Sequence, residues 1–359
     1  MAASSLPILL IEQGDYLENV DSENLPYEYQ DNLGCGVTSV VDKVMDLNTG
    51  NEFARKQYRV TGTQSNRKYM TETFHNELRN IRSLEKHRHI IQIWAAYTTE
   101  TRLCILLFPV AEEDLENYLS RLRECQDDPD RHVAQISRMT TVLVEAFGCL
   151  SSGLAFMQPH RIRHRDIKPS NILVHKGTVL YTDFGLSLDS KKLDNSSSEG
   201  ISYQTKKYRA PEVAAESLRD SSSDVFSLGC VFIKIFSAID ESFTSQEPER
   251  YAEIMDEFHS KLAHHTPNRS DIAFLPNLII WMTQREPSCR VKAQRVWDEC
   301  AQHVSCRCTP CFQSQPSSPP ATASGQGYWT DWRPTRHRPG HYYAYLMHPE
   351  GFIMETRYA

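Results

Sequence analysis

The sequence predicts an α+β fold of two lobes, with a β-rich part at the N-terminus, a helical part after it and a C-terminal extension. Residues 28–58 contain three stretches typical of β-strands, whereas later apolar residues recur at spacings of three and four, as on one face of a helix. The length of 359 residues suits two domains or one large unit of two lobes with extensions.

The N-terminal part begins with three predicted strands, at residues 29–36, 38–47 and 51–58, and the turn at 48–51 joins the last two as a hairpin. A helix follows. Its apolar residues come at spacings of four, three and three, and they are Phe74, Leu78, Ile81 and Leu84. The apolar runs at 90–97 and 102–110 predict two buried strands.

The character of the chain changes to helical after residue 114. A long amphipathic helix ends at Pro159, and its apolar residues are Leu143, Phe147, Leu150, Leu154 and Met157. Short strands are predicted at 171–175 and 178–184. The polar connection at 186–209 is too long for a simple loop. Residues 224–236 are apolar nearly all round, which predicts a buried helix, and further helices run to about residue 302.

Charge and hydropathy exclude several classes of protein. The net charge of −7 and the pI near 6.1 argue against nucleic acid as the main partner. The apolar run at 6–11 is short and follows no basic residue, so we expect neither a signal peptide nor a membrane span, and no other segment approaches spanning length. We therefore expect a soluble protein of the cytoplasm, with the nucleus left open.

Ten cysteines without a regular framework favour a reducing compartment and free thiols. Four of them crowd near the C-terminus, at Cys300, Cys306, Cys308 and Cys311. Structural zinc sites generally present paired CxxC knuckles separated by a longer loop, so reduced thiols are favoured here over a zinc site. Palmitoylation beside the flexible linker is the other alternative, which would attach the tail to a membrane.

The expected division of the chain is an extension at 1–27, a main domain at 28–302, a Cys-containing and Pro/Ser-rich linker at 303–327 and a Tyr-rich tail at 328–359. Within the main domain, we expect an N-lobe at about 28–110 and a C-lobe at about 111–302. The tail has alternating tyrosines and an HPEG turn, which predict a β-hairpin. The tail is faintly similar to a WW module, but the second Trp and the Pro that would complete such a module are missing.

Two glycines between the first two predicted strands, Gly34 and Gly36, can let backbone N–H groups approach phosphate oxygens. An ordinary hairpin with glycines in its turn explains them equally well. Lys56 lies on the third strand, where a lysine is usually an edge residue whose ammonium reaches water. Glu77, on the following helix, changes this interpretation because it can pair with Lys56 and hold the ammonium against a nucleotide's phosphates.

The run HRDIKPSN at 164–171 collects several polar groups in one loop. Asp166 can accept the proton of an attacking hydroxyl, Lys168 can balance charge on a transferred phosphoryl group, and Asn171 can bind a metal ion. Asp183, in the run TDFG, supplies the hard oxygen ligand that Mg²⁺ prefers, and Gly185 permits a sharp turn.

Together these features resemble the eukaryotic protein kinase family over residues 28–302. The matching motifs, in family order, are GCGVTSV at 34–40, FARK at 53–56, Glu77, HRDIKPSN at 164–171, DFG at 183–185, APE at 210–212, DVFSLG at 224–229 and Arg290. The resemblance implies a bilobal protein-kinase-like fold. It implies an enzyme that uses ATP and Mg²⁺, with a protein as its substrate and a role in signalling.

The resemblance also assigns residues to the nucleotide. The residues expected to surround ATP, besides Lys56, are Leu33, Gly34, Cys35, Gly36, Val41, Ala54, Leu107, Phe108, Val110 and Leu173. Among them, Leu107 would be the gatekeeper and the backbone of Phe108 and Val110 would bind adenine. Asn171 and Asp183 would hold the metal. Ser39 stands where the family has a third glycine, so we expect an altered nucleotide affinity.

The family further implies a structural frame and a substrate class. Glu212 and Arg290 would form a buried salt bridge, and Asp224 would anchor a stack of Ile81, Ile93, Phe184 and His164. Lys168 and Thr205 match the serine/threonine branch. The long segment before APE argues for a protein substrate rather than a small molecule.

Arg165 marks members whose activation segment is ordered by phosphorylation, which would require an upstream kinase. The candidate acceptors are Ser196, Ser197, Ser198 and Ser202. The alternative is an ordinary solvated loop.

Overall fold

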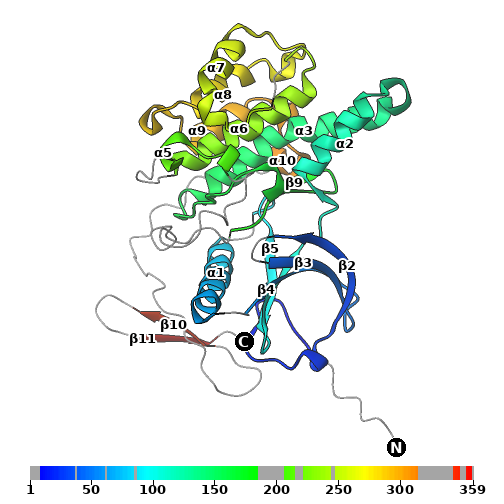
Figure 1. Ribbon diagram of the computed structural model, residues 1–359, viewed down its shortest axis with the longest axis vertical. Coiled ribbons are helices and arrows are strands. Elements are labelled where there is room, and N and C mark those ends of the chain that lie inside the picture. The colour runs from blue at the N-terminus through cyan, green and yellow to red at the C-terminus, as the bar shows by residue number, and fades with distance from the viewer. Residues whose placement is uncertain are drawn as a thin grey trace, which may run out of the picture. The chain divides into compact units, whose positions relative to one another are not determined.

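The computed structural model describes residues 9–36, 39–60, 63–84, 87–184, 206–214, 221–243, 247–313, 343–347 and 353–357. The chain divides into two compact units, Met1–Phe312 and Gln313–Ala359. In the first unit, a β-sheet at the N-terminal end is followed by a mainly helical part (Figure 1). The expected α+β fold of two lobes is confirmed.

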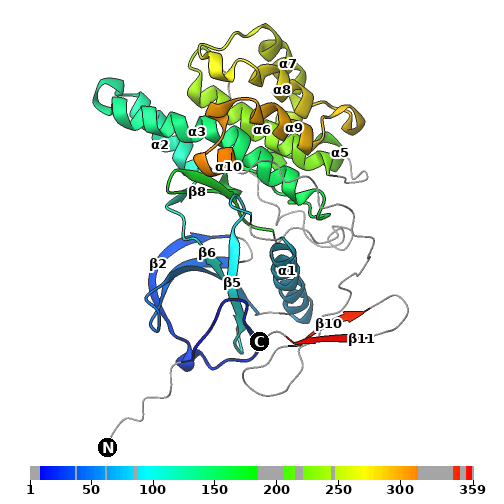
Figure 2. The same cartoon turned by 180° about the vertical axis from the view of Figure 1, so that it is seen from behind.

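The N-lobe is built on one six-stranded sheet. Its strands occur in the order β1-β5-β6-β4-β3-β2, and all neighbours are antiparallel except β1 and β5. The strands are β1 (Tyr16–Leu17), β2 (Tyr27–Cys35), β3 (Ser39–Asp46), β4 (Glu52–Arg59), β5 (Gln92–Thr98) and β6 (Arg102–Phe108). Helix α1 (Gln64–Ser83) packs beside this sheet (Figures 1 and 2).

The two faces of the sheet bury different residues because side chains alternate along each strand. Ala54 and Tyr58 of β4 belong to the main core on the α1 side, whereas Phe53 lies in a smaller cluster on the other face. Ile11 and Val44 belong to this smaller cluster too. The segment before β2, which we expected only as an extension, thus packs on the sheet, and its β1 adds an edge strand.

The C-lobe consists mainly of helices around the buried helix α6 (Ser222–Ile239). This helix contacts α2, α3 and α8, so its apolar surface is covered on several sides. The other α-helices among the described residues of this lobe are α2 (Leu115–Gln126), α3 (Pro129–Met157), α5 (Pro211–Ala214), α7 (Met255–His264), α8 (Leu275–Met282), α9 (Ala293–Ala301) and α10 (Thr309–Gln313). A small sheet of β7 (Glu113–Asp114), β8 (Ile172–His175) and β9 (Thr178–Tyr181) lies near the start of this lobe.

Within the described part of the chain, two helices are long and apolar enough to cross a membrane by length and composition, α3 and α6. The expectation that no segment approaches spanning length was therefore wrong. In the most apolar window of each helix, 67% and 78% of the residues are buried inside the protein. This burial is what core helices of a folded lobe show.

The described residues of the second unit include one antiparallel pair of strands, β10 (Tyr343–Met347) and β11 (Ile353–Arg357). Tyr343 pairs with Arg357 and Met347 with Ile353, so the two strands are joined by the run that includes HPEG.

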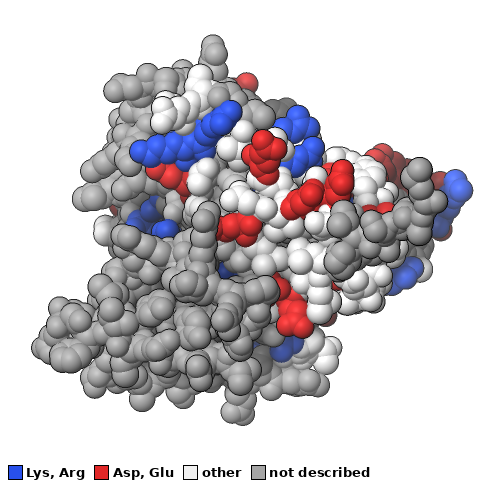
Figure 3. All heavy atoms as spheres, turned by 90° about the horizontal axis from the view of Figure 1, so that it is seen from below, with Lys and Arg blue, Asp and Glu red and all other residues white. Residues whose placement is uncertain are grey.

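On the face of the molecule shown in Figure 3, the described acidic and basic side chains are interspersed.

Candidate active site

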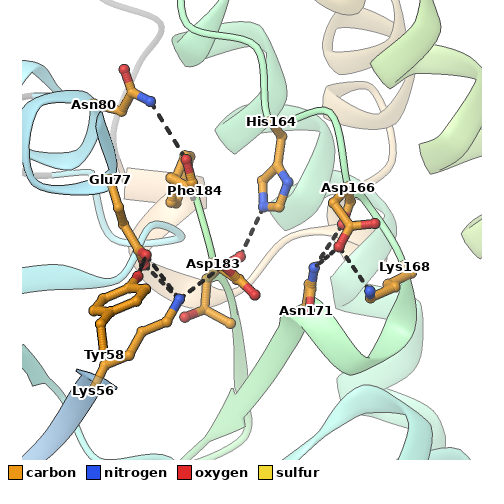
Figure 4. Close-up of polar contacts among 11 residues, drawn as sticks. Lys56, Tyr58, Glu77, Asn80, His164, Asp166, Lys168, Asn171, Asp183 and Phe184 are labelled. Atoms are coloured by element: carbon orange, nitrogen blue, oxygen red, sulfur yellow. Dashed lines mark hydrogen bonds and ion pairs between the residues drawn. The ribbon is translucent and has the colours of Figure 1, made fainter. Parts of the chain in front are cut away.

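Lys56 and Glu77 form a buried ion pair between strand β4 and helix α1. Lys56 Nζ lies 2.9 Å from Glu77 Oε1 and 2.8 Å from Oε2, and neither residue is more than 6% exposed (Figure 4). The packing of α1 explains the position of Glu77, because Phe74, Leu78 and Ile81 on the same helix are buried in the core beside the sheet. The helix therefore points Glu77 at β4.

Tyr58 is a further member of this site that the sequence analysis missed. Its hydroxyl donates a hydrogen bond to Glu77 Oε2, so this carboxylate has two partners on one strand. The signal was present in the alternation of β4, since residues 56 and 58 must point to the same face. Tyr58 lies outside the FARK motif at 53–56, from which Lys56 was predicted.

Lys56 also reaches the C-lobe. Its ammonium lies 2.8 Å from Asp183 Oδ1 (Figure 4). Burial alone would lower the pKa of Lys56, but the negative charges of Asp183 and Glu77 raise it well above its usual value. Burial raises the pKa of Asp183, but the charge of Lys56 outweighs this and lowers the pKa to about 2. Lys56 is therefore an ammonium and Asp183 a carboxylate at neutral pH.

The loop at 164–171 brings Asp166, Lys168 and Asn171 together. Asp166 Oδ2 lies 2.7 Å from Lys168 Nζ and accepts a 2.8 Å hydrogen bond from Asn171 Nδ2. Asn171 Nδ2 also donates to the backbone oxygen of Asp166, at 2.9 Å. Because the NH₂ group makes both bonds, the amide oxygen is the ligand that Asn171 can offer to a cation.

Asp224 of α6 holds the start of this loop in place. Its carboxylate accepts the backbone N–H groups of His164 and Arg165, each at 2.8 Å. Arg165 has a φ of 65° and Asp183 a φ of 63°, conformations that non-glycine residues rarely adopt. Two bends of unusual backbone thus lie beside the two carboxylates of the site, which is where such conformations tend to occur.

The expected stack connects this loop to the N-lobe. The ring of His164 lies 4.7 Å from that of Phe184, and His164 Nε2 lies 2.9 Å from the backbone oxygen of Thr182. Phe184 and Ile81 are buried in the same core, and Ile93 is partly buried against it. The described contacts therefore bring all four members into one core.

The residues expected around the nucleotide lie on β2, β3, β4 and the strands beside them. Ala54 pairs with Leu107 across β4 and β6, and Val41 pairs with Lys56 across β3 and β4. Leu33 is 41% exposed on β2. Phe108 ends β6, Val110 follows it, and both pack against the apolar cores; Leu173 of β8 is partly buried. The expected nucleotide residues thus come from the N-lobe sheet, from the segment after β6 and from the small sheet of the C-lobe.

The glycines of the first turn are not required by the described backbone. Gly34 has open space where a Cβ would stand, and at Gly36 a Cβ would be in ordinary contact, 3.5 Å from the oxygen of Ser39. Neither residue has a positive φ. Cys35, between them, is exposed. The hairpin alone therefore does not explain why glycine stands at both positions.

Glu212 and Arg290 form the ion pair expected within the C-lobe. Arg290 Nη1 and Nη2 lie 2.6 and 2.7 Å from the two carboxylate oxygens, and the Arg290 side chain is fully buried. The guanidinium also donates to the backbone oxygens of Gln284 and Arg285, at 2.7 and 2.9 Å. Its carbon lies 5.0 Å from the ring centre of Phe226. This pair ties helix α5 to the loop before α9.

Several expected residues lie outside the described part of the chain. These are Gly185, Ser196, Ser197, Ser198, Ser202 and Thr205. The geometry above therefore concerns the nucleotide and metal residues and the structural frame, and not the activation segment.

A family model described as the protein kinase domain matches residues 27–303. The chain therefore belongs to the protein kinase family. This match covers both lobes, and it agrees with the resemblance inferred from the motifs.

Curated relatives show the same similarity. The chain is 28% identical over 251 residues to a cyclin-dependent kinase 4 homolog of Caenorhabditis elegans, covering 67% of this chain and 57% of that protein. It is 28% identical over 239 residues to mitogen-activated protein kinase kinase kinase A of Dictyostelium discoideum, covering 66% of this chain and 23% of that protein. It is 29% identical over 237 residues to cyclin-dependent kinase 4 of Xenopus laevis, covering 64% and 69%.

Proposed function

We propose that this protein transfers the γ-phosphoryl group of Mg-ATP to serine or threonine hydroxyls of protein substrates, with Asp166 as the catalytic base. The observation that carries the proposal is the bridge made by Lys56, which contacts Glu77 of the N-lobe and Asp183 of the C-lobe at the same time. A kinase must bring these three residues together to act on a nucleotide. The described geometry has them together.

The nucleotide would lie against the sheet, with its phosphates near the ammonium of Lys56. Two features support this. The glycines at 34 and 36 are not needed by the hairpin, so close approach of phosphate oxygens to the backbone explains them better. Ala54 is buried next to Leu107 in register, which provides an apolar surface for adenine.

Mg²⁺ would be held by Asp183 and Asn171. The donor set fits, because Asp183 is a carboxylate of lowered pKa and Asn171 directs its NH₂ group to Asp166, which leaves an amide oxygen to bind the ion. When bound, the metal neutralises negative charge on the phosphates. The backbone bends at Arg165 and Asp183 would set the positions of the residues that hold the metal ion.

Asp166 would accept the proton of the attacking hydroxyl. Its carboxylate is fixed by Lys168 and Asn171, so its orientation does not depend on the substrate. Lys168 would lie beside the transferred group and balance its charge. Positioning and charge stabilisation of this kind provide most of the catalysis in phosphoryl transfer.

Serine or threonine as the acceptor is supported by Lys168, two residues after the base, and by the motif position of Thr205. The named relatives include cyclin-dependent kinases and a mitogen-activated protein kinase kinase kinase. We further propose that an upstream kinase phosphorylates the serine-rich segment at 196–202 and that the protein acts in the cytoplasm or nucleus. Phosphatase treatment should then lower activity, and a treated enzyme of unchanged activity would contradict this.

The test is a radiolabel assay with [γ-³³P]ATP on arrays of serine, threonine and tyrosine peptides, run with the full chain and with Asp166→Asn. We expect label on serine or threonine peptides, and a loss of about 10²–10⁴-fold in the variant while nucleotide binding is kept. Wild-type turnover in Asp166→Asn would reject the base. Nucleotide binding without transfer by the wild type would instead indicate a kinase-like scaffold.

A further inference from the structure

Four side chains that the kinase site does not use converge in the core of the first unit. They are His89, Cys149, Cys308 and Cys311, whose ligand atoms all lie within 4.8 Å of one another. Each of the four residues is at most 7% exposed. Among the residues that the structure describes, this is the one group of three or more His, Cys, Asp or Glu side chains that is gathered closely enough to hold a metal ion.

Three segments that are distant in sequence supply these ligands. His89 lies in the turn between α1 and β5, and Cys149 lies in the C-terminal half of α3. Cys308 and Cys311 form a CxxC run at the start of α10. This membership differs from the cluster expected from sequence, because Cys300 and Cys306 point elsewhere. Cys300 Sγ is 3.6 Å from Ser151 Oγ, and Cys306 Sγ is 4.0 Å from the backbone oxygen of Asp271.

We propose that His89, Cys149, Cys308 and Cys311 bind one structural Zn²⁺ ion that fastens the C-terminal segment of the kinase domain to α3 and to the turn before β5. Three thiolates and one imidazole are a common donor set of structural zinc, and its tetrahedral geometry sets ligand atoms about 3.5–3.8 Å apart. His89 Nε2 lies 3.7 Å from Cys308 Sγ and 2.9 Å from Cys311 Sγ. The distance to Cys308 lies within the expected range, and the distance to Cys311 is shorter than that range.

The orientation of His89 supports a ligand role. Its Nδ1 lies 2.8 Å from the backbone oxygen of Val179, which accepts the Nδ1–H group. This hydrogen bond leaves the lone pair of Nε2 directed at the thiols, as in zinc sites whose histidines are held by a second partner. Backbone bonds between Tyr181 N and His89 O, and between Ile91 N and Tyr181 O, each 2.9 Å long, hold the turn itself.

Two glycines of α3 provide a second, independent sign that the segments are built to meet here. A Cβ at Gly148 would stand only 2.1 Å from the backbone oxygen of Cys306. A Cβ at Gly153 would stand 2.9 Å from the ring of Tyr181 and 3.6 Å from His89 Cβ. Glycine at both positions, on either side of Cys149, lets the C-terminal segment and the histidine turn approach the helix.

A disulfide explains the cluster less well than a metal ion. An S–S bond would join only two of the three sulfur atoms of the cluster. A disulfide would also leave the lone pair of His89 Nε2 facing buried sulfur atoms with no cation to coordinate. One divalent ion satisfies all four groups at once, and Zn²⁺ suits a tetrahedral set of nitrogen and sulfur ligands.

The first test measures bound metal in the full chain, purified with a thiol reductant and excess Mg²⁺ but without chelators. We expect elemental mass spectrometry to detect about one zinc ion per chain. Cys308→Ser and Cys149→Ser should lose it, and Cys306→Ser is the matched control, because this buried thiol is in the same segment outside the cluster. Absence of zinc from the wild type, iron or copper in its place, or equal loss in Cys306→Ser would overturn the proposal.

A second test works even where a cysteine variant does not fold. The zinc of the wild-type protein is exchanged for Co²⁺, whose visible spectrum reports thiolate ligation and tetrahedral geometry. We expect thiolate charge-transfer bands and intense d–d bands, and their absence would contradict a Cys₃His site. A zinc-selective chelator should lower the Tm of the wild type and of Cys306→Ser by at least about 5 °C, whereas an unchanged Tm would reject a structural role. Neither readout depends on kinase activity.

Discussion

Lys56 Nζ lies 2.8 Å from Asp183 Oδ1, although 127 positions of sequence separate the two residues. The first is on strand β4 of the sheet and the second follows β9 of the C-lobe. Because Lys56 also contacts Glu77 of α1, one ammonium group connects sheet, helix and C-lobe. The two lobes therefore have the relative arrangement that the proposed phosphoryl transfer requires.

Replacing Lys56 should affect stability and transfer separately. Lys56→Met leaves Glu77, which is fully buried, without its cation, and we expect a loss of about 3–5 kcal/mol in the free energy of unfolding. The double variant Lys56→Met, Glu77→Leu should regain most of this stability and still be inactive. Urea unfolding and the peptide assay measure the two effects. A single variant as stable as the wild type would contradict the buried pair.

Tyr58→Phe tests the residue that the motifs did not reveal. The hydroxyl donates to a charged carboxylate, so its removal should cost about 1.5–3 kcal/mol. The matched control is Tyr181→Phe, whose hydroxyl is buried as well but donates to the neutral backbone oxygen of Leu150, and it should cost about 0.5–1.5 kcal/mol. Thermal unfolding compares the two. An equal or smaller loss in Tyr58→Phe would contradict the bond to Glu77.

The C-lobe provides a pair of arginines in different surroundings. Arg290→Met should lose about 3–5 kcal/mol, because Glu212 and two backbone oxygens lose a buried donor. Arg285→Met removes an exposed pair with Asp256 and should change stability by about 0–1 kcal/mol. Denaturant midpoints of both variants decide this, and similar losses would show that burial does not set the contribution of Arg290.

Stability should depend on the charge of Glu247 at acidic pH. Burial raises the pKa of this carboxyl, but hydrogen bonds from Lys207 and Lys234 outweigh this and lower it from its ordinary value of 4.5 to about 2. A depressed pKa contributes stability that is present above pH 4.5 and is lost as the pH falls towards 2. Glu247→Gln should therefore be less stable than the wild type at pH 7, and the difference should shrink at pH 3. A difference that stays constant with pH would refute this.

The sequence by itself identified the family and predicted the residues of the proposed site. The residues of HRDIKPSN lie within one loop, and the order of the motifs is enough to predict Lys56, Asp166, Asn171 and Asp183 as members of one site. The strands and helices of the α+β fold follow from hydrophobic spacing, because the two kinds of element bury their apolar faces with different periods. The arrangement in two kinase-like lobes was implied by the family resemblance. These properties are local or are carried by the order of motifs along the chain.

Tertiary structure alone decided which side chains meet across long distances in sequence. His89 and Cys149 join Cys308 and Cys311 because α10 and the turn before β5 both pack on α3, and no spacing in the sequence records that packing. Cys300 and Cys306 looked equivalent in sequence and point elsewhere. The physical reason is that periodicity specifies which face of an element is buried, whereas the partner that covers this face is chosen by close packing of the whole core.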